Sequence, residues 1–378
     1  MMSLCVGACT PRPRPQDSDR ASAEPPPTAP DDRFGRGTFA GTLLLFGDSG
    51  PFVLDSDGDG PVELPKDVAG LELSPDGSQV LAARFVREPT GITRHVELVT
   101  VDVHSGETAT LLKAASREDV APASWSPDGA RVAYRSTTYE RDPSVVHPFG
   151  HRSRSALCIV SVDVGEPRCF RRLGRVDGFA WSPNGAWLAI DSVGPEPLRL
   201  LEVRTGRTRT IGRPHGPWLR RVGSHGRFIG FFHPSWSPSG RYVAAVADME
   251  PRRIVVFDTR GGPVTGRGFS DVFTEPVWAP SRDVIAYASV TGRIRGNHIG
   301  LDTDLRLLHA RTGRERVVRA FRGYPLVYGL EWDPAGRAMA ALLYDAGHEQ
   351  LSLVDLEDRR WSRVRLRHSL SGLLDWAP

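Results

Sequence analysis

The stretch Ala123-Ser124-Trp125-Ser126-Pro127-Asp128-Gly129 decides the fold, because variants of it recur through the whole chain. The related segments are Leu71–Gly77, Phe179–Gly185, Pro234–Gly240, Pro276–Pro280, Leu330–Gly336 and the C-terminal Leu373–Pro378. Their anchor prolines, at positions 75, 127, 183, 238, 280, 334 and 378, follow one another at intervals of 42 to 56 residues. Recurrence of this kind is the sequence signature of a repeat architecture.

Each copy combines a large aromatic residue with a tight turn. Proline presets φ at the second turn position, Asp or Asn tolerates the next position, and Gly supplies positive φ. The Ser hydroxyl can accept a hydrogen bond from the turn backbone. The tryptophan is large enough to fill the space between neighbouring units.

Three further strands follow the first in each repeat. The second strand is short and apolar, as at Val132–Tyr134, and the third ends in a polar turn, as at Ala156–Asp163. A shorter fourth strand closes the unit, as at Thr108–Leu112. Four short strands per repeat, joined by Gly, Pro and Asp turns, are typical of a β-propeller blade. The sequence therefore predicts an all-β, seven-bladed β-propeller.

The two ends of the chain supply one blade together. Thr42–Phe46, Phe52–Asp55 and Val62–Leu64 are three strands without an inner one, and Leu373–Trp376 is an inner strand without partners. Joined, they make the seventh blade, and the closed ring leaves no exposed sheet edge.

These repeats resemble the WD40-like "PD40" repeats of bacterial TolB-type propellers over about residues 40–378. The shared pattern is Trp-Ser-Pro-[Asp/Asn]-Gly followed by an apolar strand. Leu73 in place of Trp, Asp333 in place of Ser and the missing Gly after Asp283 depart from it. The resemblance implies a non-catalytic, extracytoplasmic protein-binding scaffold, and a cytoplasmic location is the alternative.

The region before the propeller has a different character. Seven prolines lie between Thr10 and Asp32, so residues 10–39 are expected to form a disordered linker. Residues 1–9 end in Leu4-Cys5-Val6-Gly7-Ala8-Cys9, which is similar to the cleavage box of a bacterial lipoprotein, although no charged or apolar leader precedes it. Cys9 is thus a candidate lipidation site, and a lipid anchor would be the only membrane attachment. A net charge of +3 argues against nucleic acid as a partner.

Long loops on one face of the ring carry the candidate partner-binding residues. Loops between second and third strands, and between blades, emerge together on that face, and they include Thr137–Ser155 and Arg213–His233. Arginine interleaved with aromatic residues is typical of a protein contact surface. The candidates are Arg213, Trp218, Arg220, Arg221, His225, Arg227, His147, His151 and Arg152. Alternatively, these aromatic side chains bind no partner and are only buried where the loop folds over the mouth of the central channel.

The sequence patterns that indicate a metal site or a catalytic site are weaker than those that indicate the propeller. Asp55, Asp57 and Asp59, with Gly60, match the start of a calcium loop, but Lys66 occupies the position of its bidentate glutamate. These three aspartates are candidate calcium ligands, a polar turn is the alternative, and no other cofactor is expected. We expect no enzyme activity. The alternative is a lactonase-like or hydrolase-like propeller enzyme with a metal or a His/Asp site at the channel mouth.

The two internal cysteines fall in one hairpin, Leu157–Asp163 with Arg168–Leu173. Folding this hairpin about Gly165 and Glu166 places Cys169 opposite Val162. In that register Cys158 and Cys169 do not form a disulfide and are two small buried side chains.

Overall fold

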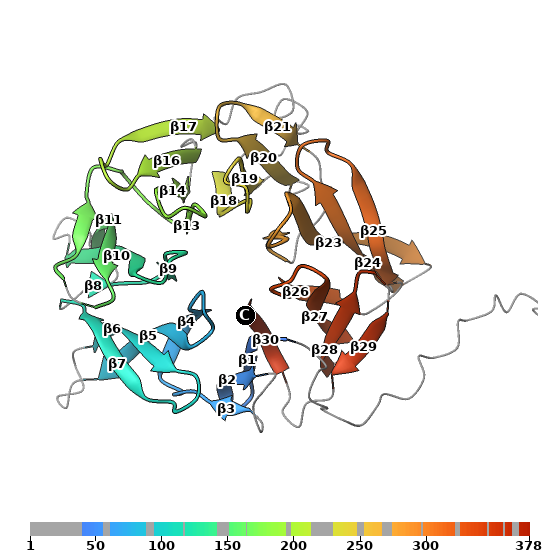
Figure 1. Ribbon diagram of the computed structural model, residues 1–378, viewed down its shortest axis with the longest axis horizontal. Coiled ribbons are helices and arrows are strands. Elements are labelled where there is room, and N and C mark those ends of the chain that lie inside the picture. The colour runs from blue at the N-terminus through green and yellow to red at the C-terminus, as the bar shows by residue number, and fades with distance from the viewer. Residues whose placement is uncertain are drawn as a thin grey trace, which may run out of the picture. The chain divides into compact units, whose positions relative to one another are not determined.

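A computed structural model describes residues 40–55, 61–87, 94–115, 118–141, 151–163, 165–193, 198–212, 230–247, 253–266, 274–295, 298–321, 326–345, 348–357, 360–364 and 370–378. Within these ranges every regular element is a β-strand, and none is a helix long and apolar enough to cross a membrane. The strands form seven antiparallel sheets that follow one another around a central axis (Figure 1). The predicted seven-bladed propeller is therefore confirmed.

Each blade has four strands, ordered from the centre of the ring outward. Blade 1 contains β30 (Leu370–Ala377), β1 (Thr42–Gly47), β2 (Gly50–Asp55) and β3 (Val62–Glu63). Blade 2 contains β4 (Val68–Leu73), β5 (Gln79–Arg87), β6 (Arg94–Asp102) and β7 (Thr108–Lys113). Blade 3 contains β9 (Ala123–Trp125), β10 (Arg131–Arg141), β11 (His151–Ser161) and β12 (Arg168–Phe170), with β8 (Glu118–Asp119) beside β10.

The remaining four blades repeat this order. Blade 4 contains β13 (Phe179–Trp181), β14 (Trp187–Ile190), β16 (Leu198–Glu202) and β17 (Thr208–Gly212). Blade 5 contains β18 (Gly230–Trp236), β19 (Tyr242–Ala247), β20 (Arg253–Asp258) and β21 (Pro263–Gly266), with β15 (Ser192–Val193) beside β18. Blade 6 contains β22 (Val277–Trp278), β23 (Val284–Arg295), β24 (His298–His309) and β25 (Glu315–Phe321). Blade 7 contains β26 (Leu326–Trp332), β27 (Ala338–Asp345), β28 (His348–Asp355) and β29 (Trp361–Val364).

Blade 1 joins the two ends of the propeller, as predicted. β30 pairs antiparallel with β1, so that Leu43 lies opposite Trp376. The indole nitrogen of Trp376 donates to the carbonyl oxygen of Ala40 at 2.8 Å. Asp375 also reaches the next blade, because its Oδ2 accepts a hydrogen bond from the backbone N–H of Leu73 at 2.8 Å. The C-terminal strand thus contacts both β1 and blade 2.

The repeated turns hold their shape through the hydrogen bonds that their residue types allow. In blade 3 the Oγ of Ser126 accepts from the N–H of Arg131 at 3.0 Å, and the N–H of Gly129 donates to the carbonyl of Ser126 at 2.8 Å. Gly129 has φ 68°, which favours glycine. In blade 7 Asp333 takes the role of the serine, because its Oδ1 accepts from the N–H of Ala338 at 2.6 Å. This departure from the repeat pattern therefore preserves the turn.

The tryptophans link neighbouring blades. Each of four indole N–H groups donates to the carbonyl that precedes the tryptophan position of the previous blade. The pairs are Trp181 with Ser124 (3.2 Å), Trp236 with Ala180 (3.0 Å), Trp278 with Ser235 (3.2 Å) and Trp332 with Val277 (3.0 Å). The core is correspondingly built between blades: one buried cluster joins Leu81 and Leu98 of blade 2 to Trp125 and Val132 of blade 3. Burial of these apolar surfaces stabilises the ring.

Several segments expected to be irregular loops are strands. The loop predicted over 137–155 contains the outer parts of β10 and β11, which pair from Arg131 with Ser161 to Arg141 with His151. In blade 6, β23 and β24 likewise pair to their outer ends, from Val284 with His309 to Arg295 with His298. The outer parts of β10 and β11 are almost entirely polar, so no alternation of apolar and polar residues predicted a strand there, although backbone pairing does not require such alternation.

The predicted register of the cysteine hairpin is wrong. β11 and β12 pair Leu157 with Phe170 and Cys158 with Cys169, and the two cysteines form a disulfide. The connection between these strands spans residues 162–167 and is longer than the tight turn assumed about Gly165. The longer connection shifts the partner of Cys169 from Val162 to Cys158.

Candidate functional site

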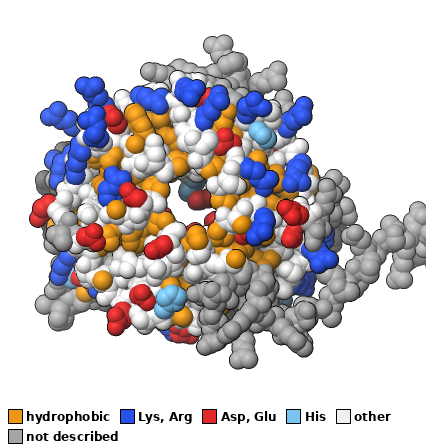
Figure 2. Space-filling view, viewed as in Figure 1, with side chains coloured by type: hydrophobic (Ala, Val, Ile, Leu, Met, Phe, Trp, Pro, Cys, Tyr) orange, Lys and Arg blue, Asp and Glu red, His pale blue; other side chains and the backbone are white. Residues whose placement is uncertain are grey.

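The propeller presents two different faces. One, which we call the hairpin face, carries the ends of the hairpins between second and third strands and the connections between blades. The other, which we call the turn face, carries the Ser-Pro turns and the turns between third and fourth strands. A cavity of about 450 Å³ opens among Pro75, Pro127, Trp181, Trp236 and Pro378 on the turn face. Figure 2 shows one face, with hydrophobic side chains around the central opening and Lys and Arg gathered toward the rim.

Exposed aromatic side chains occur on the hairpin face, near the ends of second strands. Among the described residues, five large hydrophobic side chains are exposed, and four of them are aromatic: Phe46, Phe85, Tyr139 and Tyr344, at 38% to 45%. Each lies near the C-terminal end of the second strand of its blade, in β1, β5, β10 and β27. Their blades, 7, 1, 2 and 3, are consecutive around the ring. We call these four residues the aromatic arc.

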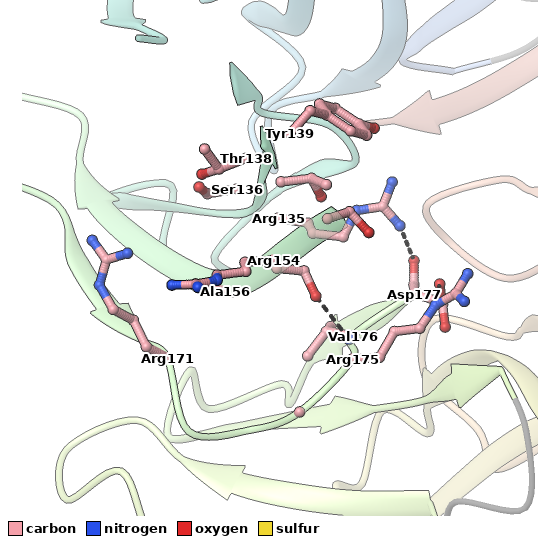
Figure 3. A pocket seen from close by; sticks show the side chains of 14 residues that line it. Arg135, Ser136, Thr138, Tyr139, Arg154, Ala156, Arg171, Arg175, Val176 and Asp177 are labelled. Carbon is pink, nitrogen blue, oxygen red and sulfur yellow. Dashed lines mark hydrogen bonds and ion pairs between the residues drawn. The ribbon is translucent and has the colours of Figure 1, made fainter. Parts of the chain in front are cut away.

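An arginine-lined pocket adjoins the aromatic arc in blade 3. Its cavity of about 810 Å³ lies between the outer part of the β10–β11 hairpin and the connection from β12 to β13 (Figure 3). Four arginines line it: Arg135 from β10, Arg154 from β11, and Arg171 and Arg175 from the connection. Tyr139 of the aromatic arc also lines the pocket.

One carboxylate balances part of this positive charge. Asp177, the only acidic residue among those that line the cavity, accepts a hydrogen bond from Nε of Arg175 at 2.9 Å. A guanidinium nitrogen of Arg135 donates to the backbone carbonyl of Asp177 at 3.1 Å. Figure 3 shows Arg135 and Arg175 beside Asp177, and Arg154 and Arg171 at the other end of the pocket. The described lining of the pocket thus contains four arginines and one aspartate.

Asp191 connects the pocket to the mouth of the central channel. The backbone N–H of Asp177 donates to the Asp191 carbonyl, and Oδ1 of Asp191 accepts from the N–H of Gly178 at 2.5 Å. The Asp191 side chain is buried, and this desolvation raises its pKa to about 6 despite the bond from Gly178 and the nearby His233.

His233 and Glu275 lie at the same mouth. Nδ1 of His233 contacts Oε1 of Glu275 at 2.8 Å, and both side chains are more than half exposed. The hydrogen bond from His233 lowers the pKa of Glu275. His233 has φ 52°, which makes it the one non-glycine residue with positive φ in the described ranges. Such strain persists where the surroundings hold it, and it is often found at functional sites.

The channel itself carries carboxylates at a repeated position, three residues before each anchor proline. Glu72, Glu331 and Asp375 occupy it in blades 2, 7 and 1, and Ser124, Ala180, Ser235 and Val277 occupy it in the others. Desolvation, with the charge of Asp375, raises the pKa of Glu72 to about 8. Desolvation also raises the pKa of Asp375 to about 6, and that of Glu331 well above its ordinary value. Glu72 accepts a hydrogen bond from Oγ of Ser124 at 3.0 Å, so these groups connect adjacent blades.

The sequence-predicted site residues fall mostly outside the described ranges. These are Arg213, Trp218, Arg220, Arg221, His225, Arg227, His147, Asp57, Asp59 and Cys9. The chain enters the 213–229 segment from Gly212 of β17 and leaves it at Gly230 of β18, both on the hairpin face. His151 and Arg152 begin β11, paired with Arg141 and Glu140, and Asp55 ends β2.

Two features of the site were not predicted from the sequence. The aromatic arc was missed because its members stand at different distances from their anchor prolines: Phe85 and Tyr344 follow theirs by 10 residues, and Tyr139 follows its own by 12. The arginine pocket was missed because its residues come from segments that only the strand register brings together. In the part of the chain that the structure describes, no three His, Cys, Asp or Glu side chains are placed to hold a metal ion.

Comparison with known proteins reveals similarity of fold. No family model and no curated protein matches the chain. An oligogalacturonate lyase solved in complex with manganese matches 84% of this chain and 86% of its own, with a TM-score of 0.58 and 15% identity. A Vibrio parahaemolyticus oligogalacturonate lyase matches 84% of this chain and 92% of its own, with a TM-score of 0.56 and 11% identity. TolB from Acinetobacter baumannii matches 87% of this chain and 78% of its own, with a TM-score of 0.46 and 14% identity. At these identities the lyase comparisons support the propeller fold alone.

Proposed function

We propose that this propeller is a non-catalytic scaffold that binds a protein partner through its hairpin face. The observation that carries the proposal is the aromatic arc, because four of the five exposed large hydrophobic side chains among the described residues lie near the hairpin-face ends of second strands in consecutive blades. Scattered exposed hydrophobics are ordinary, but a grouped set marks an interaction site. Aromatic residues with adjacent arginines are enriched where binding energy concentrates in protein interfaces.

The sequence-predicted residues on the 213–227 segment, with His147, His151 and Arg152, belong to the same proposed surface. The flanks of both segments lie on the hairpin face, beside the blades that carry the pocket. The proposal therefore places one partner across the hairpin face, with the aromatic arc as its apolar contact.

We also propose that the protein works outside the cytoplasm. The Cys158–Cys169 disulfide supports this location, because disulfides persist in oxidising compartments and are rare in the cytosol. We further propose that Cys9 is lipidated and that the lipid holds the protein at a membrane. We also propose that Asp55, Asp57 and Asp59 bind calcium; of these four residues, only Asp55 lies within the described ranges.

Partner capture from a lysate of the source organism tests the scaffold proposal. The full chain would be crosslinked and its partners identified by mass spectrometry, alongside a Phe85→Ser/Tyr139→Ser/Tyr344→Ser variant. We expect the variant to lose the partner recovered by the unchanged protein. Val317→Ser is the matched control, because Val317 is equally exposed but lies on the outer strand β25. Recovery that is the same for the triple variant and the control would refute the proposal.

A catalytic or metal-binding channel mouth is the second candidate function. The contact between His233 and Glu275 and the positive φ of His233 favour it, since a histidine oriented by a carboxylate can act as a base or a metal ligand. A transition metal bound in stoichiometric amount by the full chain, lost in His233→Ala and retained in His104→Ala, would support this candidate. His104 lies in the exposed turn after β6 and provides the control.

A further inference from the structure

Charge divides the turn face into two sectors. In blades 2 and 3 the turns of this face carry five acidic residues and neither Lys nor Arg, and in blades 4 to 6 they carry seven arginines and a single acidic residue, Asp283. The acidic residues of blades 2 and 3 are Asp76, Glu107, Asp128, Asp163 and Glu166, all exposed. The arginines of blades 4 to 6 are Arg204, Arg207, Arg241, Arg260, Arg282, Arg311 and Arg314, also exposed. We call these two groups the acidic sector and the basic sector.

The contrast persists when the strand residues beside these turns are counted. They add to the acidic sector Asp102, Arg131 and Arg168, and to the basic sector Glu202, Asp258 and Glu315. The acidic sector stays net negative and the basic sector stays net positive. The count is complete for these blades, because the only position of their turns outside the described ranges is residue 164, a valine.

Contacts within the molecule neutralise only part of these charges. Arg241 contacts Asp258 at 3.1 Å, and both belong to the basic sector. Arg131 contacts Asp128 at 3.5 Å, and both belong to the acidic sector. Among the described residues no ion pair joins one sector to the other, so the two charges stay separated across the face. Figure 2 shows Lys and Arg gathered over the upper part of the ring, where Figure 1 places blades 4 and 5.

The centre of the turn face is apolar. The anchor prolines Pro75, Pro127, Pro183 and Pro280 are exposed there, and the cavity of about 450 Å³ opens among the first two of them. An apolar centre surrounded by charged residues is the usual arrangement of a protein–protein interface. The turn face therefore has the composition of a docking surface.

The separated charges select the partner. A uniformly charged partner, such as a nucleic acid, would be attracted by one sector and repelled by the other. A partner that fits must present both signs in the reversed order, and a second copy of the same face does so. A two-fold axis in the plane of the face, passing between blades 3 and 4 and through blade 7, places blade 3 opposite blade 4 and blade 2 opposite blade 5.

We propose that two copies of this chain associate through their turn faces, with the acidic sector of each against the basic sector of the other. A two-fold contact of this kind makes both pairs of sectors at once and closes the assembly at a dimer. It leaves the hairpin face of each copy pointing outward. The inference is therefore independent of the scaffold proposal, which concerns the hairpin face.

Sedimentation equilibrium of the full chain tests the dimer. We expect a dimer at about 20 mM NaCl, with a dissociation constant that rises by about tenfold or more at about 500 mM NaCl, because salt screens exposed charges. Asp163→Arg/Glu166→Arg makes the blade 3 turn basic, and Arg204→Glu/Arg207→Glu makes the blade 4 turn acidic. At low salt we expect each variant to dimerise about tenfold or more weakly than the unchanged protein, because like charges then face each other.

A mixture of these two variants separates charge pairing from damage to the fold. In the mixed pair the reversed blade 3 turn of one variant faces the reversed blade 4 turn of the other, and the two unchanged turns face each other. Both contacts again join opposite charges, so we expect the mixture to dimerise within about threefold of the unchanged protein. The control is Arg171→Glu/Arg172→Glu, which reverses two exposed arginines in the β12–β13 connection on the hairpin face and should leave the dimer unchanged.

Three results would overturn the inference. One is a full chain that stays monomeric at low salt over the micromolar range. Another is a dimer that the turn-face variants do not weaken, or that the hairpin-face control weakens equally. The third is a mixture of the two turn-face variants that remains dissociated.

Discussion

Trp125 and Trp332 occupy equivalent positions and are buried to the same degree, at 5% and 4% exposure, but only one of them has a hydrogen bond for its indole. Nε1 of Trp332 donates to Val277, whereas Nε1 of Trp125 is buried without a partner. The preceding blade carries Glu72 and Leu73 where blade 6 carries Val277 and Trp278. The series of indole hydrogen bonds is therefore interrupted between blades 2 and 3.

These two residues give a matched comparison. Trp332→Phe removes a buried hydrogen bond and leaves a carbonyl oxygen without its donor, whereas Trp125→Phe removes an unpaired donor. We expect Trp332→Phe to lower the free energy of unfolding by about 1 kcal/mol more than Trp125→Phe. Urea denaturation of both variants measures the difference. Equal losses would mean that the indole hydrogen bonds add nothing to the packing of the tryptophans.

Glu72 makes the stability depend on pH. Its pKa is raised from 4.5 to about 8, so between these values the folded state holds a proton that the unfolded state has released. The unfolded state then binds fewer protons, and stability falls as the pH rises through this range. Asp375 and Glu331 act in the same direction. We expect the melting temperature to decrease from about pH 5 to about pH 8.

The control for this pH dependence is a neutral side chain of the same shape. Glu72→Gln can still accept from Ser124, and we expect it to make the decrease smaller, whereas Glu107→Gln on the exposed β6–β7 turn should leave the decrease unchanged. A decrease in melting temperature that is the same in Glu72→Gln and in the unchanged protein would contradict this account.

On the acid side, the lowered pKa values of Asp76 and Asp128 stabilise the fold above their ordinary pKa of 3.8, and this stabilisation is lost as the pH falls below it.

At the scale of the element, the blade hairpins separate what the sequence could predict from what it could not. The inner strands were predictable because each ends at a recurring turn that contains an anchor proline. The outer parts of β10 and β11 were not, because Ser136, Thr138 and Arg154 give no apolar alternation. The arginine pocket depends on those outer parts and on the β11–β12 register, so it could not be found without the structure.

The β11–β12 pairing yields a chemical prediction. Because Cys158 lies directly opposite Cys169, we expect both thiols of the folded, air-oxidised protein to resist alkylation until a reductant is added. Peptide mass spectrometry after alkylation reads each cysteine separately. Alkylation of Cys158 and Cys169 in denaturant without reductant would contradict the disulfide and remove the support that it gives to an oxidising location.

At the scale of the whole molecule, ring closure organises both faces. β30 places Trp376 against β1 and Asp375 against blade 2, so the chain termini of the propeller are joined within one sheet. That closure brings blades 7, 1, 2 and 3 into one consecutive series, which is the series that carries the aromatic arc. The proposed partner surface thus spans the junction and requires the ring to be closed.

Thermal melting of a chain that lacks residues 373–378 tests this closure most directly. The deletion removes most of β30, including the buried Trp376, from its contacts with β1 and blade 2. We expect the melting temperature to fall by about 10 °C or more, since several kcal/mol of burial and strand pairing are lost. We expect a chain that lacks residues 1–9 instead to have the same melting temperature as the full-length protein. A C-terminally shortened chain that also melts at the full-length temperature would contradict the closed seven-bladed ring.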